Sequence, residues 1–494
     1  MSDKLQIALA EGDGIGPEIT KACLTVFEAA GCLDVLDFVP VEMGSKVFDA
    51  GDSRGMTDDA IDTVERLGLL YKGPMGTPIG GGGKSINVTL RKALGAFANL
   101  RHFQSLPGVE TVYSRAGVPV DFYVVRENIE DTYGGIEHRL SNDVVECKRL
   151  ISAPGCDQIH GYAFRTAQAL GIDRVTCGHK ANIMKMTDGL FLERFRHAAR
   201  NYPEIQADDV IIDALCMNLV LKPQQYQMVV LPNLQGDIVS DLAAGLVGGL
   251  GFAPSANIGD KVSIFEAVHG TAPDIAGQNK ANPTSLLLSG LILLRHIGMQ
   301  KQASMIENAL LYTLESGVHT GDVKGEKDPV GTAEFGRAIA DNLGKTPSDD
   351  YARPVPSEDR PRFTPPERPR VNTLIRTFET TESAYCGCDV YLDTLLAPHD
   401  LAEKLNMVAA GSPFKLTLIS NRGTQVWPTG SIYTEIVDYY RVRFEIIDKT
   451  MIGRMSQMPA IWLLEKIAEK FNVTDFQPLK EYDGKPGYSK AQGQ

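Results

Sequence analysis

The strongest candidates for chemistry in this chain are two carboxylates four residues apart, Asp237 and Asp241. At this spacing on a helix, both side chains project from one face, where like charges in adjacent turns repel each other. A hard divalent cation with oxygen ligands, Mg²⁺ or Mn²⁺, would relieve that repulsion. The alternative is an exposed acidic first turn that favours the positive end of the helix, and spacing alone favours this simpler interpretation. A metal site therefore needs support from residues elsewhere in the chain.

A second polar group follows the four glycines at 80–83. Consecutive glycines permit a mobile loop or a close approach of the backbone to a ligand, although a flexible linker has the same composition. The residues that follow combine a hydroxyl, an amide and two guanidinium groups: Ser85, Asn87, Arg91 and Arg101. Because Arg binds carboxylates in a bidentate manner, this segment favours a substrate with several carboxylates.

Further polar residues follow predicted strands, where functional residues are common. Arg126 and Tyr133 come after a strand predicted over 120–125, and Asp213 is predicted to end a strand that begins at Val210. Lys180 and Lys185 both follow a strand that begins near Val175, although a lysine is more commonly solvated than functional.

Two glycine-containing turns could approach a nucleotide. Gly12, Gly14 and Gly16 have the spacing G-x-G-x-G, which is not the dinucleotide fingerprint, so we expect a tight strand-to-helix turn with Pro17 at the helix start. The small residues at 270–277 follow a strand at 264–269 and suit the flat face of a base plus a ribose. An ordinary Pro/Gly connection is the alternative.

Composition restricts the class of protein. The 494 residues are enough for two or three domains, and the net charge of -13 argues against nucleic acid or anionic membrane as the main partner. Eight scattered cysteines without a signal peptide at Met1 are typical of reduced thiols, so we expect a cytoplasmic protein. Cys386 and Cys388 are too close together for a zinc pair, and no apolar run is long enough to cross a bilayer.

Five segments, in order, resemble motifs of the isocitrate and isopropylmalate dehydrogenase family, the β-decarboxylating dehydrogenases. They are residues 12–18, 85–91, 126–133, 233–241 and 269–273, and the resemblance extends over residues 1 to about 345. The tail is similar to the extra C-terminal domain of the long bacterial homodimeric isocitrate dehydrogenases.

The resemblance implies an α/β fold of the isopropylmalate dehydrogenase type, with central mixed sheets and without the Rossmann arrangement. The implied parts are a large domain (1–96 and 248–348), a small domain (97–130 and 156–247), a clasp or arm (131–155), a Pro-rich linker (349–371) and a small α+β C-terminal domain (372–494). A lone hairpin is only marginally stable, so we expect the arm to pair with a second subunit.

The family comparison implies that Arg91, Arg101 and Arg126 bind the substrate carboxylates. Ser85 and Asn87 would face the third carboxylate of isocitrate, whereas isopropylmalate enzymes place apolar residues there. An isopropyl group would leave the polar side chains of Ser85 and Asn87 without hydrogen-bond partners, at a cost of about 1–3 kcal/mol in binding free energy, so isocitrate is favoured. Homoisocitrate is less well excluded.

The resemblance also implies the catalytic roles. Asp237 and Asp241 would hold Mg²⁺ or Mn²⁺ together with Asp213 of the partner subunit. The partner subunit's Lys180 would help to remove the proton of the C2 hydroxyl, while Lys185 stays at the surface, and Tyr133 would protonate the enol after CO₂ leaves. The expected assembly is a homodimer with shared active sites, or a higher oligomer.

The nucleotide site implied by the resemblance consists of Thr77, Asn182, Glu266, His269, Gly270, Thr271, Ala272, Pro273, Asp274, Ile275, Asn282 and Asp322. NADP-dependent members place Lys-Tyr where this chain has Asp274 and Ile275. A carboxylate would repel a 2′-phosphate and accept hydrogen bonds from free ribose hydroxyls. Residues 319–323 also lack the expected arginine, although Lys324 and Lys327 lie nearby. The sequence therefore predicts NAD as cofactor.

The leading hypothesis is an NAD-dependent isocitrate dehydrogenase that produces 2-oxoglutarate and CO₂. A homoisocitrate or isopropylmalate dehydrogenase is the alternative within the family. A non-catalytic regulatory subunit with an interaction tail is the alternative of another class, but it predicts degraded active-site positions, and the matched positions are intact. The tail carries no catalytic constellation, so structural support or self-association is its expected role.

Overall fold

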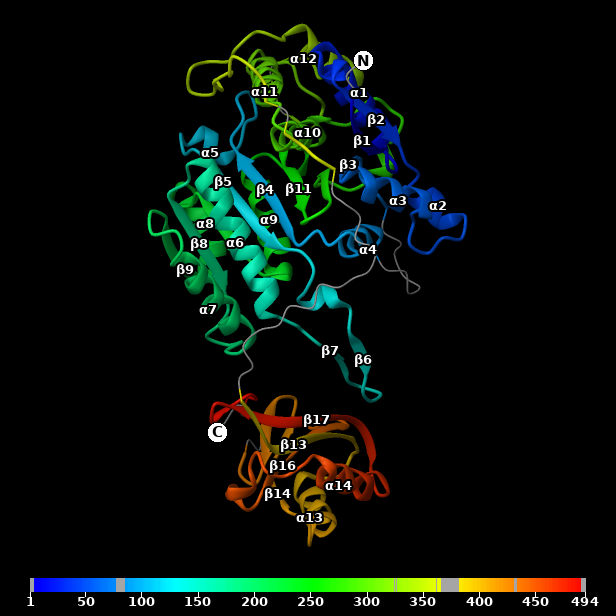
Figure 1. Cartoon of the computed structure of the whole chain (residues 1–494), viewed down its shortest axis with the longest axis vertical. Coiled ribbons are helices and arrows are strands. Elements are labelled where there is room, and N and C mark those ends of the chain that lie inside the picture. Colours follow the sequence, from blue (N-terminus) through cyan, green and yellow to red (C-terminus); the bar gives the residue numbers. More distant parts are fainter. Residues whose placement is uncertain are drawn as a thin grey trace. The chain divides into compact units, whose positions relative to one another are not determined.

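The computed structural model describes residues 4–76, 85–323, 325, 327–360, 362–365, 382–430 and 433–489. Contacts divide the chain into two compact units (Figure 1). The first unit consists of residues 1–134 and 149–373, and the second consists of residues 135–148 and 374–494. The predicted division of residues 1–348 into a large and a small domain stays a prediction, because these residues gather into one unit apart from the arm.

The first unit is built on one mixed sheet of ten strands. From edge to edge these are β2 (Leu36–Pro40), β1 (Leu5–Ala10), β3 (Leu69–Lys72), β12 (Ser263–Ala267), β11 (Pro254–Ile258), β4 (Ala98–Gln104), β5 (Asp121–Glu127), β10 (Met228–Leu231), β8 (Arg174–His179) and β9 (Gln206–Ile211). The two flanks are parallel, whereas β11 pairs antiparallel with β12 and β4, and β4 pairs antiparallel with β5. The predicted α/β fold with a mixed sheet is confirmed.

Helices cover both faces of this sheet, and the alternation of side chains along each strand decides which face a residue supplies. The front face is covered by α3 (Asp58–Leu67), α4 (Ile86–Ala93), α8 (Ile212–Leu221) and α9 (Asn233–Leu246). The rear face is covered by α1 (Gly16–Ala29), α6 (Ala153–Leu170), α7 (Thr187–Ala199), α10 (Thr284–His296), α11 (Gln300–Glu315) and α12 (Thr332–Asp341). In β1, for example, Ile7 and Leu9 enter the rear core, whereas Ala8 and Ala10 enter the front core.

The first turn of the chain has the predicted form. Strand β1 leads through a tight turn into α1, which carries Pro17 in its first turn. Gly14 has a φ of 60°, and a Cβ there would lie 2.1 Å from the carbonyl oxygen of Thr271. The glycine therefore allows this turn to touch the 270–277 segment.

Two predicted boundaries differ from those in the structure. Strand β9 ends at Ile211, so Asp213 lies in the first turn of α8 rather than at a strand end. The apolar run from Val210 continues across the strand-to-helix junction and hides the boundary. Residues 349–360 and 362–365, within the predicted linker of 349–371, belong to the first unit, where the backbone N–H groups of Arg360 and Arg362 donate to the carbonyls of Gly298 and Ile297.

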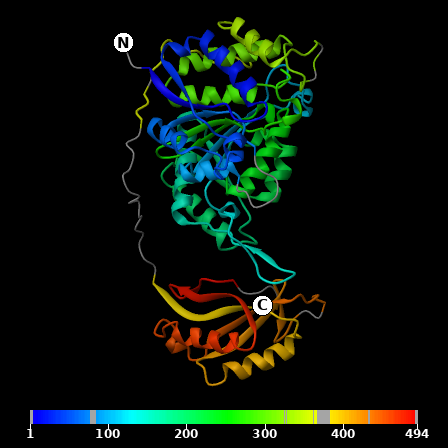
Figure 2. The same cartoon turned by 90° about the vertical axis from the view of Figure 1, so that its right-hand side faces the viewer.

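The second unit contains an antiparallel sheet of six strands with two helices on one face, as Figures 1 and 2 both show. The sheet order is β15 (Thr424–Trp427), β14 (Phe414–Asn421), β16 (Tyr439–Ile446), β13 (Ser383–Asp393), β17 (Asn472–Tyr482) and β18 (Lys485–Pro486), and the helices are α13 (Pro398–Ala409) and α14 (Met458–Ala468). The arm, β6 (Glu137–Arg139) and β7 (Val145–Cys147), belongs to this unit. Ser141 donates to Asp438 at 2.6 Å, and Lys148 pairs with Asp475 at 3.1 Å.

Among the described residues, no helix combines the length and apolar character that a membrane span requires.

Candidate functional site

A cavity of about 290 Å³ opens on the front face where β3, β12, β11 and β4 lie side by side. Its lining includes Asn87 and Arg91 from α4, Arg101 from β4, Glu266 from β12 and His269 beyond the end of β12. The antiparallel centre of the sheet brings these distant segments together. Most of the residues predicted to bind substrate therefore lie around one cavity.

Arg126, Asp237 and Tyr133 form a second cluster. Arg126 is buried on β5, and its Nη1 forms an ion pair with Asp237 Oδ1, while its Nε and Nη2 donate to Asn233 Oδ1 at 3.1 and 2.8 Å. Tyr133 Oη donates to Asp237 Oδ2 at 2.6 Å. A Cβ at Gly236 would lie 2.6 Å from Arg126 Cγ, so glycine allows α9 to approach the arginine.

Burial and charge set the protonation of this cluster. Burial and the hydrogen bond to Asp237 raise the pKa of Tyr133, so its phenol stays protonated at neutral pH. Burial opposes ionisation of Asp237, but the charge of Arg126 and the hydrogen bond from Tyr133 outweigh it and lower the pKa of this carboxyl. The cluster thus holds a carboxylate next to a phenol that can donate a proton.

Arg101 links this cluster to the other carboxylate of α9. Its Nη1 donates to Ser240 Oγ at 2.6 Å and lies 3.7 Å from Asp241 Oδ1, and its Nε donates to Asn99 Oδ1 at 2.9 Å. Burial, followed by repulsion from Arg126 and Arg91, lowers the pKa of Arg101 to about 10. Three mutually repelling guanidinium groups therefore converge, which favours an anionic ligand between them.

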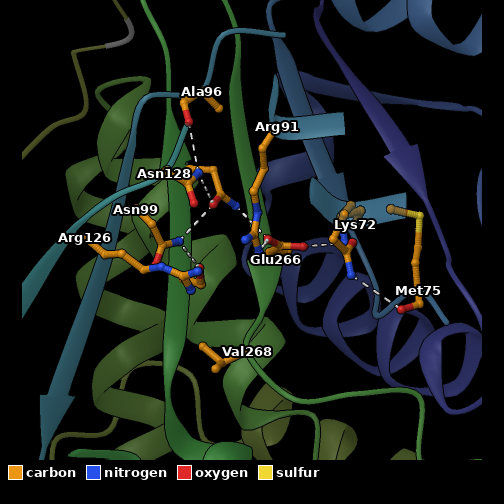
Figure 3. A network of polar contacts seen from close by, with 12 residues as sticks. Lys72, Met75, Arg91, Ala96, Asn99, Arg126, Asn128, Glu266 and Val268 are labelled. Atoms are coloured by element: carbon orange, nitrogen blue, oxygen red, sulfur yellow. Dashed lines mark hydrogen bonds and ion pairs between the residues drawn. The ribbon is translucent and has the colours of Figure 1, made fainter. Parts of the chain in front are cut away.

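Glu266 is the centre of a buried network that includes a residue missed by the sequence analysis, Lys72 (Figure 3). The Glu266 side chain, 5% exposed, pairs with Lys72 and with Arg91 Nη2 at 2.9 Å, and it accepts from Asn257 Nδ2 at 2.7 Å. Burial lowers the pKa of Lys72, an effect that the charge of Glu266 partly offsets. Lys72 ends a strand just before Gly73 and Pro74, a position that could have been recognised from the sequence.

Buried amides support this network from the centre of the sheet. Asn99 Nδ2 donates to Ser255 Oγ at 2.7 Å and to Asn257 Oδ1 at 2.9 Å. Asn128 Nδ2 donates to the same Asn257 oxygen at 3.1 Å. These bonds orient Asn257 toward Glu266, so they fix the base of the cavity.

Three polar atoms at the cavity are buried without a hydrogen-bond partner in the described part of the chain: Asn87 Oδ1, Arg91 Nε and His269 Nε2. Leaving such atoms unpaired is costly, so each suits a bond to a ligand. Burial lowers the pKa of His269, which keeps its ring neutral at pH 7. Ser85 is the N-cap residue of the same helix, α4.

Most of the residues predicted to bind the nucleotide fall into three groups. Gly270 and Thr271 line the cavity with His269, and the Thr271 carbonyl accepts from the Ile15 N–H at 2.9 Å. Asn282 donates to Asp322 at 2.9 Å, so this predicted pair is in contact. Pro273, Asp274 and Ile275 form a 3₁₀ turn after Ala272, whose φ of 39° is unusual for a residue with a side chain. Asn182 is exposed beyond β8, and Thr77 lies outside the described residues.

The carboxylates of α9 suit a hard divalent cation in ligand type, but one chain supplies only part of a site. Asp241 is 65% exposed, while Lys180 Nζ forms an ion pair with Asp213 Oδ1. Over the described ranges, no three His, Cys, Asp or Glu residues gather closely enough to hold a metal. Asp237 and Asp241 alone therefore do not form a complete cation site in the described part of the chain. Lys185 is exposed, as predicted.

Comparison with known proteins covers the whole chain. Residues 6–339 match the family described as isocitrate/isopropylmalate dehydrogenase, and residues 383–494 match the bacterial isocitrate dehydrogenase C-terminal domain. A protein of Thermus thermophilus named isocitrate dehydrogenase [NADP] is 43% identical, with 99% of this chain and 96% of that protein covered. A crystal structure of the TT0538 protein from Thermus thermophilus aligns with a TM-score of 0.90 at 42% identity, with 99% of this chain and 96% of that chain covered. A mitochondrial protein of Dictyostelium discoideum, named as a regulatory subunit of isocitrate dehydrogenase [NAD], is 46% identical over 70% of this chain and 95% of its own length.

The names of the full-length relatives contradict the predicted NAD dependence. The Thermus protein and three relatives from Rickettsia species are all named as NADP enzymes. The prediction relied on repulsion by the Asp274 carboxylate and on the missing arginine in residues 319–323, but Asp274 is exposed to water, which screens its charge. Lys280 also lies on the same loop: its Nζ donates to Gln278, and Gln278 donates to the Asp274 carbonyl at 2.7 Å. These two local features were therefore too little to exclude a phosphate.

Proposed function

The chain belongs to the isocitrate/isopropylmalate dehydrogenase family, and we propose that it is an NADP-dependent isocitrate dehydrogenase that releases CO₂ and 2-oxoglutarate. Oxidative decarboxylation of isocitrate agrees with the names of the relatives that match its full length. The observation that carries the proposal is the convergence of Arg91, Arg101 and Arg126 near the α9 carboxylates.

The polarity of α4 supports isocitrate as the substrate. Asn87 reaches the cavity with an unpartnered Oδ1 and with a Nδ2 whose hydrogen bond to the Met75 carbonyl is long, at 3.5 Å. A third carboxylate or the hydroxyl of the substrate could use these groups, whereas an isopropyl group would leave them unpaired at a cost of about 1–3 kcal/mol.

Proton transfer is proposed for Tyr133 and Lys180. Tyr133 Oη already donates to Asp237, so its proton points toward the α9 carboxylates, where it can pass to the enol carbon after CO₂ leaves. Lys180 of the partner subunit would take up the C2 hydroxyl proton. Mg²⁺ or Mn²⁺, when bound by Asp237, Asp241 and Asp213 of the partner subunit, would lower the pKa of that hydroxyl and polarise the ketone. NADP would accept the hydride.

The surface of α8 and α9 supports the proposed homodimer. Met217, Val220 and Leu221 are exposed on one face of α8, and Leu234 and Ile238 are exposed on the neighbouring α9. Asp241 follows Leu234 and Ile238 at helical spacing, so a subunit that covered this apolar face would approach the incomplete metal site.

All eight cysteines are free thiols, which fits the proposed cytoplasmic location. For the nucleotide, Lys280 is the proposed contact of the 2′-phosphate.

The proposal is tested by steady-state rates with Mg²⁺ on isocitrate, homoisocitrate and isopropylmalate, each with NADP and with NAD. We expect the highest kcat/KM with isocitrate and NADP, and a selective loss with NADP in Lys280→Gln. Turnover confined to isopropylmalate, or the absence of turnover on all three acids, would contradict the assigned function. Activity that persists in a diluted, fully monomeric sample would contradict shared active sites.

A further inference from the structure

A second and larger cavity, of about 970 Å³, lies on the rear face of the same strands that carry the substrate residues. Arg101 and Ser255 point to the front cavity, whereas their neighbours His102 and Pro254 line the rear cavity. The alternation of side chains along β4 and β11 thus separates the two cavities by one layer of sheet.

The rear cavity lies between α6 on one side and α10 and α11 on the other, all of which cover the rear face of the sheet. Helix α6 supplies Tyr162, Arg165 and Ala169, and α10 and α11 supply Leu288, Ile292 and Glu307, among others. Its volume is in the range of about 300–1,000 Å³ that small-molecule sites occupy, and its lining is mixed apolar and polar.

The floor is aromatic. The rings of His102 and Tyr123 stack in parallel, with centroids 4.0 Å apart, and His102 Nε2 lies 2.6 Å from Asp121 Oδ1. The hydrogen bond and the stacking fix both rings, so they form a preorganised aromatic pair next to aliphatic side chains.

Positive charge is in excess around this floor. Glu307 is one carboxylate shared by two arginines, Arg295 and Arg353, the latter through an Nε–Oε1 distance of 2.6 Å. Arg165 has no carboxylate within ion-pair distance in the described chain. Three arginines therefore face two carboxylates, Glu307 and Asp121, in a protein of net charge -13.

From these features we propose that the rear cavity is a second binding site, for an organic anion with a flat apolar body. The body would lie against the His102–Tyr123 surface and the aliphatic wall, and the anionic group would reach Arg165. This site is distinct from the substrate cavity, and its occupation does not depend on the proposed reaction.

The test is equilibrium binding of anilinonaphthalene sulfonate, an aromatic anion, to the full chain by fluorescence, with saturating isocitrate and Mg²⁺ present to occupy the front cavity. Arg165→Glu reverses the charge at the site, and Ala169→Trp fills the cavity from an exposed position of α6. We expect each to raise the Kd at least about tenfold. Arg200→Glu makes the same charge change at an exposed residue outside the cavity and should leave the Kd unchanged.

An unchanged Kd in Arg165→Glu would overturn the proposal, and so would equal weakening in Arg200→Glu. Should Ala169→Trp fail to fold, the two charge variants decide the result alone. Because binding is read without turnover, the comparison of Arg165→Glu with Arg200→Glu does not require catalysis, and dye bound in the front cavity would appear as a component that neither substitution weakens.

Discussion

Replacing Glu266 by Gln removes the carboxylate that is paired with Lys72. The Lys72 side chain is 1% exposed, and that of Glu266 is 5% exposed, so water cannot replace the lost charge. Removing one partner of a buried ion pair costs about 3–5 kcal/mol. Arg91, 14% exposed, has better access to solvent, so most of the penalty falls on Lys72. Lys72 can lose its proton, which offsets part of the penalty, so we expect a loss of about 3 kcal/mol.

The two tryptophans allow this loss to be assigned to one unit. Trp427 and Trp462 both lie in the second unit, so their fluorescence reports urea unfolding of that unit alone. Far-UV circular dichroism follows both units. The dichroism transition that has no counterpart in fluorescence belongs to the first unit, and Glu266→Gln should lower its urea midpoint. The midpoint of the fluorescence transition, which belongs to the second unit, should stay unchanged.

A double-mutant cycle separates the ion pair from other effects. Lys72→Met removes the buried cation, so the variant with both substitutions should be at least about 1 kcal/mol more stable than the sum of the two single losses predicts. A Glu266→Gln protein within about 0.5 kcal/mol of the parent, or a cycle that is simply additive, would refute the reasoning.

Three further predictions concern single groups. Burial lowers the pKa of His160 to about 3 from its usual 6.5. Because the unfolded chain binds this proton first, the free energy of unfolding should fall by about 1.4 kcal/mol per pH unit between about pH 6 and pH 3. Urea unfolding of His160→Gln at a series of acidic pH values should lack this part of the pH dependence. If the free energy of unfolding of the variant and of the parent fell equally with pH, the prediction would be wrong. Tyr133→Phe should lower kcat about 10²–10⁴-fold with little change in the KM for isocitrate, whereas the matched Tyr312→Phe should match the parent. Asp241→Asn should raise the Mg²⁺ concentration for half-maximal activity at least about tenfold, with the KM for isocitrate measured at saturating Mg²⁺ as its control.

Local signals in the sequence were sufficient for part of the site. The turn at Gly14 and the helix that carries Asp237 and Asp241 follow from residue spacing and from turn chemistry, which act over a few residues. The three arginines were identified by residue type, because guanidinium groups after strands and glycine loops commonly bind anions.

The remaining features depend on which strands become neighbours. Lys72 and Glu266 meet only because β3 pairs in parallel with β12, with Glu266 opposite Lys72 in the register. The rear cavity depends likewise on α6 and α10 covering the same face of the sheet. Asp213 was misplaced because the apolar run from Val210 shows no local change at the strand-to-helix junction. Such partners are set by the order of strands, which one sequence does not reveal.

The composition of the second unit has a consequence for synthesis on the ribosome. Its arm, 135–148, is made more than two hundred residues before the sheet at 383–486 that completes the unit. At roughly 5–20 residues per second, the arm waits for about 15 to 65 seconds without Asp438 and Asp475, the partners of Ser141 and Lys148. The strand residues of β6 are Glu137, His138 and Arg139, all exposed, so this strand of the waiting hairpin presents polar and charged side chains to other nascent chains, whereas β7 also exposes Val145. The charged edge strand β6 therefore disfavours pairing with other chains during synthesis, before the second unit is complete.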